Sequence, residues 1–184
     1  MTTMTTDTTP RVWIGCLACY NAGRLVGEWF PAAGAGDVTT YDVHSAHSRA
    51  DSHDELWVMD HEYLPISGEC SPADAAAWAE LLDSVDDWQR DAFRAWVAAG
   101  DYSHDGDGLP SVSDFQDAYC GEWDTFQQYA EELAEDTGLL AGVPDEFVGY
   151  FDWQAWARDL AYDYNTADAP SHGVYVFRTF RPLP

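Results

Sequence analysis

The sequence predicts an α+β protein, with short strands toward both ends of the chain and helices between them. Apolar runs at residues 12–20 and 173–180, rich in β-branched and aromatic side chains, are typical of buried strands. Residues 71–99 instead repeat apolar side chains at helical spacing. Hydrophobic residues make up 46% and aromatic residues 15% of the 184 residues, so the chain can bury a core and is not expected to be disordered as a whole.

The first 70 residues are predicted to contain a disordered tail, residues 1–10, and a small α+β domain, residues 11–70. The strands of this domain are expected at 12–20, 24–30 and 55–60. Asn21, Ala22 and Gly23 indicate the turn between the first two strands. A Gly/Ala loop is expected at 31–36 and a short helix at 41–47.

A helical middle domain is predicted over residues 71–109. Ser71 is a typical helix N-cap, Pro72 suits the first helical position, and Asp74 supplies an acid three residues after the cap. One helix is expected to run from this cap to about residue 99, where Gly100 ends it. Trp88 is expected on the apolar face of that helix.

A C-terminal α+β domain is predicted over residues 110–184. Ser113 with Gln116, and Thr125 with Gln128, have the spacing of capping boxes that begin helices. These helices are expected to end near residues 119 and 136, the second of them closed by Gly138. One or two further helices are expected within 144–162, followed by the last strand at 173–180.

The charge balance is the outlying feature of the composition. Thirty-three acidic residues stand against eight arginines and no lysine, so the net charge at neutral pH is −25, and residues 95–157 contain no arginine or lysine. Such a chain repels nucleic acid and anionic lipid and favours cationic partners. Duplex DNA carries one charge per about 1.7 Å of its axis, so 25 charges match about 42 Å of duplex, roughly a dozen base pairs.

Part of this charge is predicted to lie on helix faces opposite the apolar side chains. Four acids of the middle domain share one such face: Glu80, Asp83, Asp87 and Asp91. Two like-charged pairs four residues apart are expected in the C-terminal domain: Glu131–Glu135 and Glu132–Asp136. Each such pair destabilises a helix by about 0.2–0.5 kcal/mol, so stability is given up for an electric field, or the protein lives in an unusual solvent.

Composition alone leaves three explanations of the acidic surface open: imitation of DNA, a halophilic surface, and generic acidic solubility. A salt titration separates them. A halophilic protein loses structure at low salt, whereas a DNA mimic stays folded and loses affinity for its target as salt rises.

The four cysteines do not form a disulfide framework by their spacing. Cys16 and Cys19 have CxxC spacing, but the predicted strand places them on opposite faces of a sheet. Cys70 and Cys120 are isolated, so no second pair completes a zinc site. We therefore expect buried structural thiols and no bound metal.

Two other segments carry metal-binding residue types. Residues 101–112 partly fit a calcium loop, with Gly106 at position six but Val112 where a bidentate Glu is needed, so an acidic loop is expected. His44, His47 and His53, beside Asp51 and Asp54, form a loose cluster that keeps a metal-dependent hydrolase open as an alternative. A solvated segment is the preferred interpretation, and neither catalysis nor a cofactor is expected.

The chain shows no signal-peptide pattern and no run of 18 apolar residues. We therefore expect a soluble cytoplasmic protein with reduced thiols and no membrane contact.

Four blocks, in order along the chain, resemble the ArdA family of antirestriction proteins. The first is VWIGCLACYNAGRLVGEWF at 12–30, and the second is ELWVMDHEYLP at 55–65. The third and fourth are AYCGEWDTFQQYAEELAEDTG at 118–138 and YFDWQAWARDLAYDY at 150–164. The resemblance runs from residue 12 to about residue 177, and its four ordered blocks make it specific.

The resemblance implies an elongated, curved chain of small domains: N-terminal α+β, helical middle and C-terminal α+β. It implies a protein of mobile genetic elements that imitates bent DNA and inhibits type I restriction-modification enzymes, binding their specificity and methyltransferase subunits. It also implies a homodimer formed through the C-terminal domain, near the antirestriction region at 139–150. The residues expected there are Leu139, Leu140, Val143, Pro144, Phe147 and Tyr150.

On this interpretation, carboxylates stand in for phosphates and pair with Arg and Lys of the target's DNA-binding groove. Because the charge is dispersed, neutralising one acid is expected to cost little and neutralising a patch to cost much. The predicted DNA-mimic surface comprises Glu80, Asp83, Asp86, Asp87, Asp91, Asp101, Asp105, Asp107, Asp114, Asp117, Glu122, Asp124, Glu131, Glu132, Glu135 and Asp136.

Overall fold

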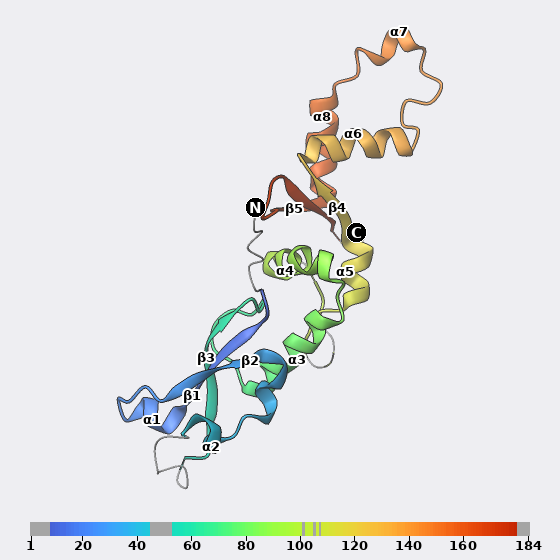
Figure 1. Cartoon of the computed structure of the whole chain (residues 1–184). Helices are drawn as coiled ribbons and strands as arrows, with labels where there is room; N and C mark the ends of the chain where they lie inside the picture. Colours follow the sequence, from blue (N-terminus) through green and yellow to red (C-terminus); the bar gives the residue numbers. More distant parts are fainter. Residues whose placement is uncertain (1–7, 45–52, 101, 105, 107, 180–184) are drawn as a thin grey trace, which may run out of the picture. The chain divides into compact units, whose positions relative to one another are not determined.

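The computed structural model describes residues 8–44, 53–100, 102–104, 106 and 108–179. The chain divides into two compact units, Met1–Asp87 and Trp88–Pro184. Each unit has a three-stranded antiparallel sheet with helices beside it, so the predicted α+β class is confirmed (Figure 1). The separate middle domain, residues 71–109, stays a prediction.

The sheet of the N-terminal unit has the order β2-β1-β3. Its strands are β1 (Arg11–Cys16), β2 (Gly27–Pro31) and β3 (Leu56–Glu62). The central strand β1 pairs antiparallel with both neighbours. Val12, Ile14 and Val58 are completely buried, because side chains alternate between the two faces of a strand and these point into the core.

Within the described residues, short helices accompany this sheet: α1 (Leu17–Asn21), the 3-10 helix η1 (Ala32–Asp37), α2 (Thr40–Val43) and α3 (Pro72–Asp83). Helix α3 packs on η1, and both contribute fully buried alanines, among them Ala35 and Ala75. Small side chains allow the two backbones to approach closely. The predicted loop at 31–36 is therefore wrong: the Gly/Ala segment forms η1 and packs against α3.

The single helix predicted from residue 72 to about residue 99 is also wrong. Helix α3 ends at Asp83, and the Ser84 hydroxyl donates a hydrogen bond of 2.6 Å to the carbonyl oxygen of Leu81. Serine satisfies backbone groups in this way at helix ends. The 3-10 helix η3 (Asp87–Gln89) and helix α4 (Arg90–Ala99) follow. Trp88 consequently lies outside any apolar helix face and is 70% exposed.

The sheet of the C-terminal unit has the order β4-β6-β5, with β4 (Tyr119–Trp123), β6 (Val174–Arg178) and β5 (Tyr164–Asp168). The central strand β6 confirms the predicted last strand. Strands β4 and β5 were not predicted, because neither has a long apolar run. Both are held by antiparallel pairing with β6.

Helix α5 (Val112–Ala118) leads into β4 and begins at Ser111, whose hydroxyl accepts from the Asp114 N–H. The predicted capping box at Ser113 is therefore wrong by two residues. Helix α6 (Phe126–Asp136) begins as predicted, with the Thr125 hydroxyl accepting from the Gln128 N–H. The last helices are α7 (Asp145–Val148), α8 (Trp153–Leu160) and the 3-10 helix η4 (Ala161–Asp163).

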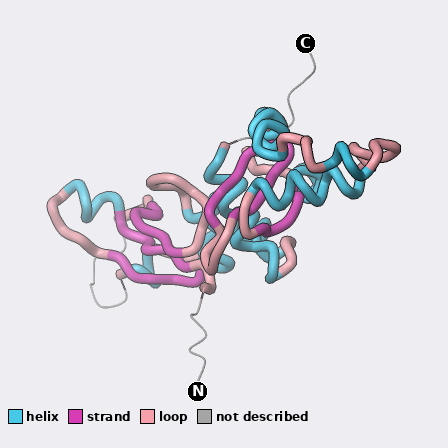
Figure 2. The backbone as a smooth tube through the Cα atoms, turned by 90° about the horizontal axis from the view of Figure 1, so that it is seen from above, coloured by secondary structure: helices cyan, strands magenta, loops and turns pink. Residues whose placement is uncertain are grey.

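Helices α6 and α8 pack against each other (Figure 1), and the Trp156 indole N–H on α8 donates to the carbonyl oxygen of Ala130 on α6. Figure 2 shows the helices, strands and loops of the described chain in separate colours. The core beneath α4 and α5 is aromatic. Phe115 lies 5.2 Å from Phe93 and 5.6 Å from Trp96 between ring centroids, and all three are at most 1% exposed. None of the helices within the described residues is both long and apolar enough to cross a membrane.

Candidate functional site: the acidic surface and the Cys-His cluster

Thirteen of the sixteen acids predicted to form the acidic surface lie in the described part of the chain. Eleven of these are exposed, and Asp114 and Glu131 are half-buried. The other three lie within the acidic loop expected at 101–112, outside the described residues: Asp101, Asp105 and Asp107. The carboxylates are thus placed where a partner can reach them.

Helix α6 arranges its acids as predicted. Tyr129, Ala130 and Ala134 are buried on one side, while Glu132 and Asp136 are exposed. These two acids stand one helical turn apart, so their like charges face one another. The other pair is Glu131–Glu135, in which Glu131 accepts a hydrogen bond of 2.7 Å from the Gln127 amide.

The break after α3 changes the second predicted acidic face. Glu80 and Asp83 are exposed on α3, whereas Asp87 belongs to η3 and Asp91 to α4. The like-charged pairs Asp83–Asp87 and Asp87–Asp91 therefore do not share one continuous helix. Asp91 also forms a salt bridge of 2.8 Å with Arg94, which offsets part of its charge. The prediction of one unbroken face from Glu80 to Asp91 is wrong.

Most of the negative charge remains even when such salt bridges are counted. Eight arginines face 33 acids, so at least 25 carboxylates have no arginine of their own even if every arginine is paired. The observed pairs, Arg94 with Asp91 and Arg158 with Asp159, join near neighbours in sequence. The acidic field is therefore a property of the folded chain as well as of its composition.

The predicted antirestriction region at 139–150 exposes large apolar side chains. Tyr150 is 85% exposed, Phe147 56%, Leu139 41% and Val143 38%. The segment includes α7, which lies away from the sheet of its own unit, beyond α6 and α8 (Figure 1).

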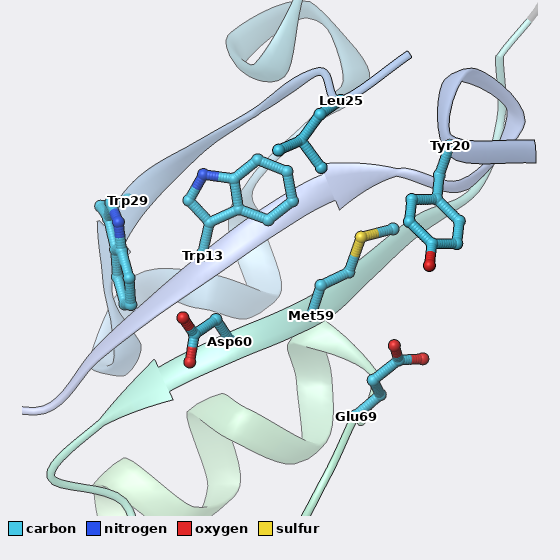
Figure 3. A pocket seen from close by; sticks show the side chains of 7 residues that line it. All are labelled: Trp13, Tyr20, Leu25, Trp29, Met59, Asp60 and Glu69. Carbon is cyan, nitrogen blue, oxygen red and sulfur yellow. The ribbon is translucent and has the colours of Figure 1, made fainter. Parts of the chain in front are cut away.

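An open pocket of about 410 Å³ lies on the outer face of the N-terminal sheet (Figure 3). Its lining is Trp13, Tyr20, Leu25, Trp29, Met59, Asp60 and Glu69. The paired Gly15 and Gly27 make room for the Trp13 indole, since a Cβ at Gly15 would lie 2.6 Å from Trp13 Cζ3. Aromatic faces beside two carboxylates suit an arginine or lysine side chain. Sequence reasoning missed this pocket.

The cysteine prediction is wrong in its geometry. Strand β1 stops at Cys16, and Cys19 lies on α1 instead of continuing the strand. The turn brings the two sulfurs to the same side, where His53 Nδ1 lies 3.2 Å from Cys16 Sγ and 3.4 Å from Cys19 Sγ. His44 Nε2 lies 3.4 Å from the same His53 nitrogen. The ligand atoms of these four residues, the Cys-His cluster, lie within 4.8 Å of one another.

Burial sets the chemistry of this cluster. Cys16 is 0%, Cys19 2% and His44 4% exposed, and His53 is half-buried. The pKa of the Cys19 thiol is raised by burial and by its hydrogen bond with Cys16, against an opposing influence of Arg24. The Arg24 guanidinium donates to Cys19 Sγ at 3.8 Å.

The loose histidine cluster that left a metal-dependent hydrolase open as an alternative is divided. His44 and His53 join the cysteines, Asp54 is exposed, and His47 and Asp51 lie outside the described residues. The separated motifs were visible in the sequence as a CxxC and two later histidines. The assumption of one strand over 12–20 hid their connection.

A family model described as Antirestriction protein (ArdA) matches residues 12–175, which is most of the chain. Among curated proteins, none matches the chain significantly.

Proposed function

Because the chain belongs to the ArdA family of antirestriction proteins, we propose that it inhibits type I restriction-modification enzymes by occupying their DNA-binding groove in place of DNA. Antirestriction activity, and with it an interaction with restriction-modification enzymes, follows from the family. The family is not one of known enzymes. The type I target and the mechanism of DNA imitation are the proposal.

The acidic face of α6 is the observation that carries this proposal. Glu132, Glu135 and Asp136 are exposed on a helix whose other side is buried. No arginine or lysine lies between residues 95 and 157 in the sequence to neutralise them locally. A groove that binds DNA presents Arg and Lys to phosphates. Carboxylates held on a folded surface meet the same cations without base-specific contacts.

The target subunits are proposed to be the specificity and methyltransferase subunits, because these hold the duplex. The acids act together, each pairing with a cation at about 0.2–1 kcal/mol. Inhibition is therefore independent of DNA sequence and weakens as salt screens the charges.

Competition with a DNA duplex for a type I methyltransferase, measured by fluorescence anisotropy at several salt concentrations, tests the proposal. The chain is expected to displace DNA at low salt, and its apparent affinity is expected to fall steadily as salt rises. Circular dichroism on the same samples should show a folded chain throughout. Loss of structure at low salt would instead support a halophilic surface.

A patch variant tests the role of α6: Glu132→Gln, Glu135→Gln and Asp136→Asn together. It is expected to weaken competition about tenfold, the effect of roughly 1.4 kcal/mol. The matched control removes three exposed acids that lie outside the predicted surface: Glu28→Gln, Asp37→Asn and Glu62→Gln. An equal loss in both variants would contradict a specific surface, and abolition of inhibition by Asp87→Asn alone would contradict distributed charge.

We also propose that the exposed apolar side chains at 139–150 form a homodimer interface. Leu139, Val143, Phe147 and Tyr150 support this, with Leu140 and Pro144 beside them in sequence. Burying them against a second copy removes apolar area from water at about 25 cal/mol per Å².

Sedimentation analysis tests the dimer. The double variant Phe147→Ala and Tyr150→Ala is expected to shift the chain to monomer at micromolar concentration. Tyr162→Ala is the matched control, because Tyr162 is 71% exposed in the same unit but lies outside the region. A monomeric wild-type chain would refute the interface.

A further inference from the structure

The Cys-His cluster has the donor set and placement of a metal site. We propose that Cys16, Cys19, His44 and His53 bind one zinc ion, which acts as a structural cross-link of the N-terminal unit. The inference does not depend on the antirestriction mechanism.

Distances within the cluster match a tetrahedral ion. Zinc binds sulfur at about 2.3 Å and imidazole nitrogen at about 2.0–2.1 Å, so neighbouring ligand atoms around it lie about 3.3–3.8 Å apart. His53 Nδ1 lies 3.2 and 3.4 Å from the sulfurs of Cys16 and Cys19, and 3.4 Å from His44 Nε2. All four ligand atoms lie within 4.8 Å of one another, close enough to share one ion.

Hydrogen bonding within the protein does not account for this crowding. A neutral imidazole nitrogen either donates one hydrogen or accepts one hydrogen bond. His53 Nδ1 nevertheless has three close polar neighbours, two sulfurs and one nitrogen. A cation at the centre turns all four atoms into ligands and removes the conflict.

Charge also favours a divalent ion at this place. Two thiolates and two neutral imidazoles neutralise Zn²⁺, and a neutral complex suits a site in which three of the four ligands are at most 4% exposed. The Cys19 N–H points at Cys16 Sγ from 3.5 Å, and Arg24 donates to Cys19 Sγ. Both contacts stabilise negative charge on sulfur. Soft thiolates with imidazoles in a tetrahedral arrangement select zinc over calcium or magnesium.

The local fold supplies the ligands from separate elements at one end of the sheet. Cys16 ends β1 and caps α1, and Cys19 lies within α1. His44 follows α2, and His53 precedes β3. Figure 1 shows α1 and α2 at the same end of this sheet. One ion would tie these elements together across the 37 positions that separate Cys16 and His53.

The site is closed. Four protein ligands leave no open position for water or substrate, which is the pattern of structural rather than catalytic zinc. This argues against the hydrolase that the histidines suggested in the sequence. Metal binding instead contributes directly to folding of the unit that holds it.

Metal analysis of the full-length chain tests the proposal. The protein is purified without an affinity tag from zinc-supplemented cells, and zinc is measured by mass spectrometry. One zinc ion per chain is expected. The chain reconstituted with cobalt should show a thiolate-to-cobalt charge-transfer band and the strong visible bands of tetrahedral cobalt. Substoichiometric zinc together with absence of both spectral features would overturn the proposal.

Variants then locate the site. Cys19→Ser and His53→Ala are each expected to weaken cobalt binding by at least about tenfold. Cys70→Ser and His61→Ala are the matched controls, since both residues are half-buried in the same unit and outside the cluster. Equal loss of metal in the controls would overturn the assignment. The wild-type cobalt spectrum keeps the test valid if a ligand variant does not fold.

Removal of the metal gives a further readout. A strong chelator is expected to lower the thermal unfolding temperature of wild-type protein, and added zinc should restore it. The His53→Ala variant should not respond to either treatment. If chelator does not change the unfolding temperature of the zinc-loaded wild type, a structural role is contradicted. None of these results depends on competition with DNA.

Discussion

The two units carry almost the same net charge but build their cores from different side chains. Residues 1–87 contain 15 acids and 3 arginines, a net charge of −12, and residues 88–184 contain 18 acids and 5 arginines, a net charge of −13. The N-terminal core consists mainly of aliphatic residues and alanines, such as Ile14, Val58 and Ala75. The C-terminal core is built from aromatic rings, with Phe93 and Phe115 completely buried.

The two units also differ in how far their tryptophans are exposed. Trp13 and Trp29 are half-buried and line the open pocket. Trp96 of the C-terminal unit is 1% exposed within an aromatic cluster. The two units thus carry nearly equal net charge although their cores differ. This indicates that the acidity is required of the surface and does not depend on how each core is packed. The proposed zinc site adds a cross-link to the unit that lacks the aromatic core.

Removing one buried aromatic ring from the C-terminal core should have the largest effect on the stability difference between the two units. Phe115→Ala is expected to lower the free energy of unfolding by about 3–5 kcal/mol, because it opens a cavity among Phe93, Trp96 and Tyr119. Urea unfolding followed by near-ultraviolet circular dichroism measures the loss.

Tyr162→Ala, at an exposed position of the same unit, should change stability by no more than about 0.5 kcal/mol. The cobalt spectrum of the N-terminal unit should persist in Phe115→Ala. An effect no larger than that of Tyr162→Ala would show that the aromatic cluster does not hold the C-terminal unit.

Alkaline pH should lower the stability of the C-terminal unit, by less than the Phe115→Ala substitution does. Burial, and then the charges of Glu122, Asp91 and Tyr119, raise the pKa of Tyr175 to about 12. Free tyrosine has a pKa of about 10, so the folded chain holds this proton more tightly than the unfolded chain does. The resulting stability is fully present below about pH 10 and is lost as pH rises through about 12.

Tyrosinate absorbance and urea midpoints, measured across this range, check the expectation. Tyr175→Phe should weaken the pH dependence, whereas Tyr162→Phe should leave it unchanged. The N-terminal unit has no tyrosine among its described buried residues, so no tyrosine of raised pKa is expected there; burial instead raises the pKa of its Cys70 thiol to about 11. A pH dependence that is the same in Tyr175→Phe as in the wild type would contradict the expectation.

Signals confined to a few neighbouring residues predicted local structure well. Ser71 with Asp74 forms the capping box that begins α3, and Thr125 caps α6 as expected. These interactions span three residues, so the sequence carries all the information they need. The end of α3 was not predicted because Ser84 fits the helical spacing of the sequence. In the fold, its hydroxyl donates a hydrogen bond back to the carbonyl oxygen of Leu81.

Strands β4 and β5 show where local signals end. Tyr119–Trp123 contains Gly121 at a positive φ of 106°, and Tyr164–Asp168 alternates only weakly. Strand β4 forms because β6 pairs with it from a distant part of the chain, whereas β5 closely precedes β6 and pairs with it as a hairpin. Strand propensity depends on such neighbours more than helix propensity does.

The sequence by itself determined the charge of −25, the α+β class, the starts of α3 and α6, and the resemblance that named the family. Each of these depends on composition or on residues close together in the chain. Only the tertiary structure decided that the acids from Glu80 to Asp91 lie on separate elements and that Cys16 and His53 meet. The physical reason is that contacts between distant residues depend on where strands and helices end. A single residue such as Ser84 can end a helix.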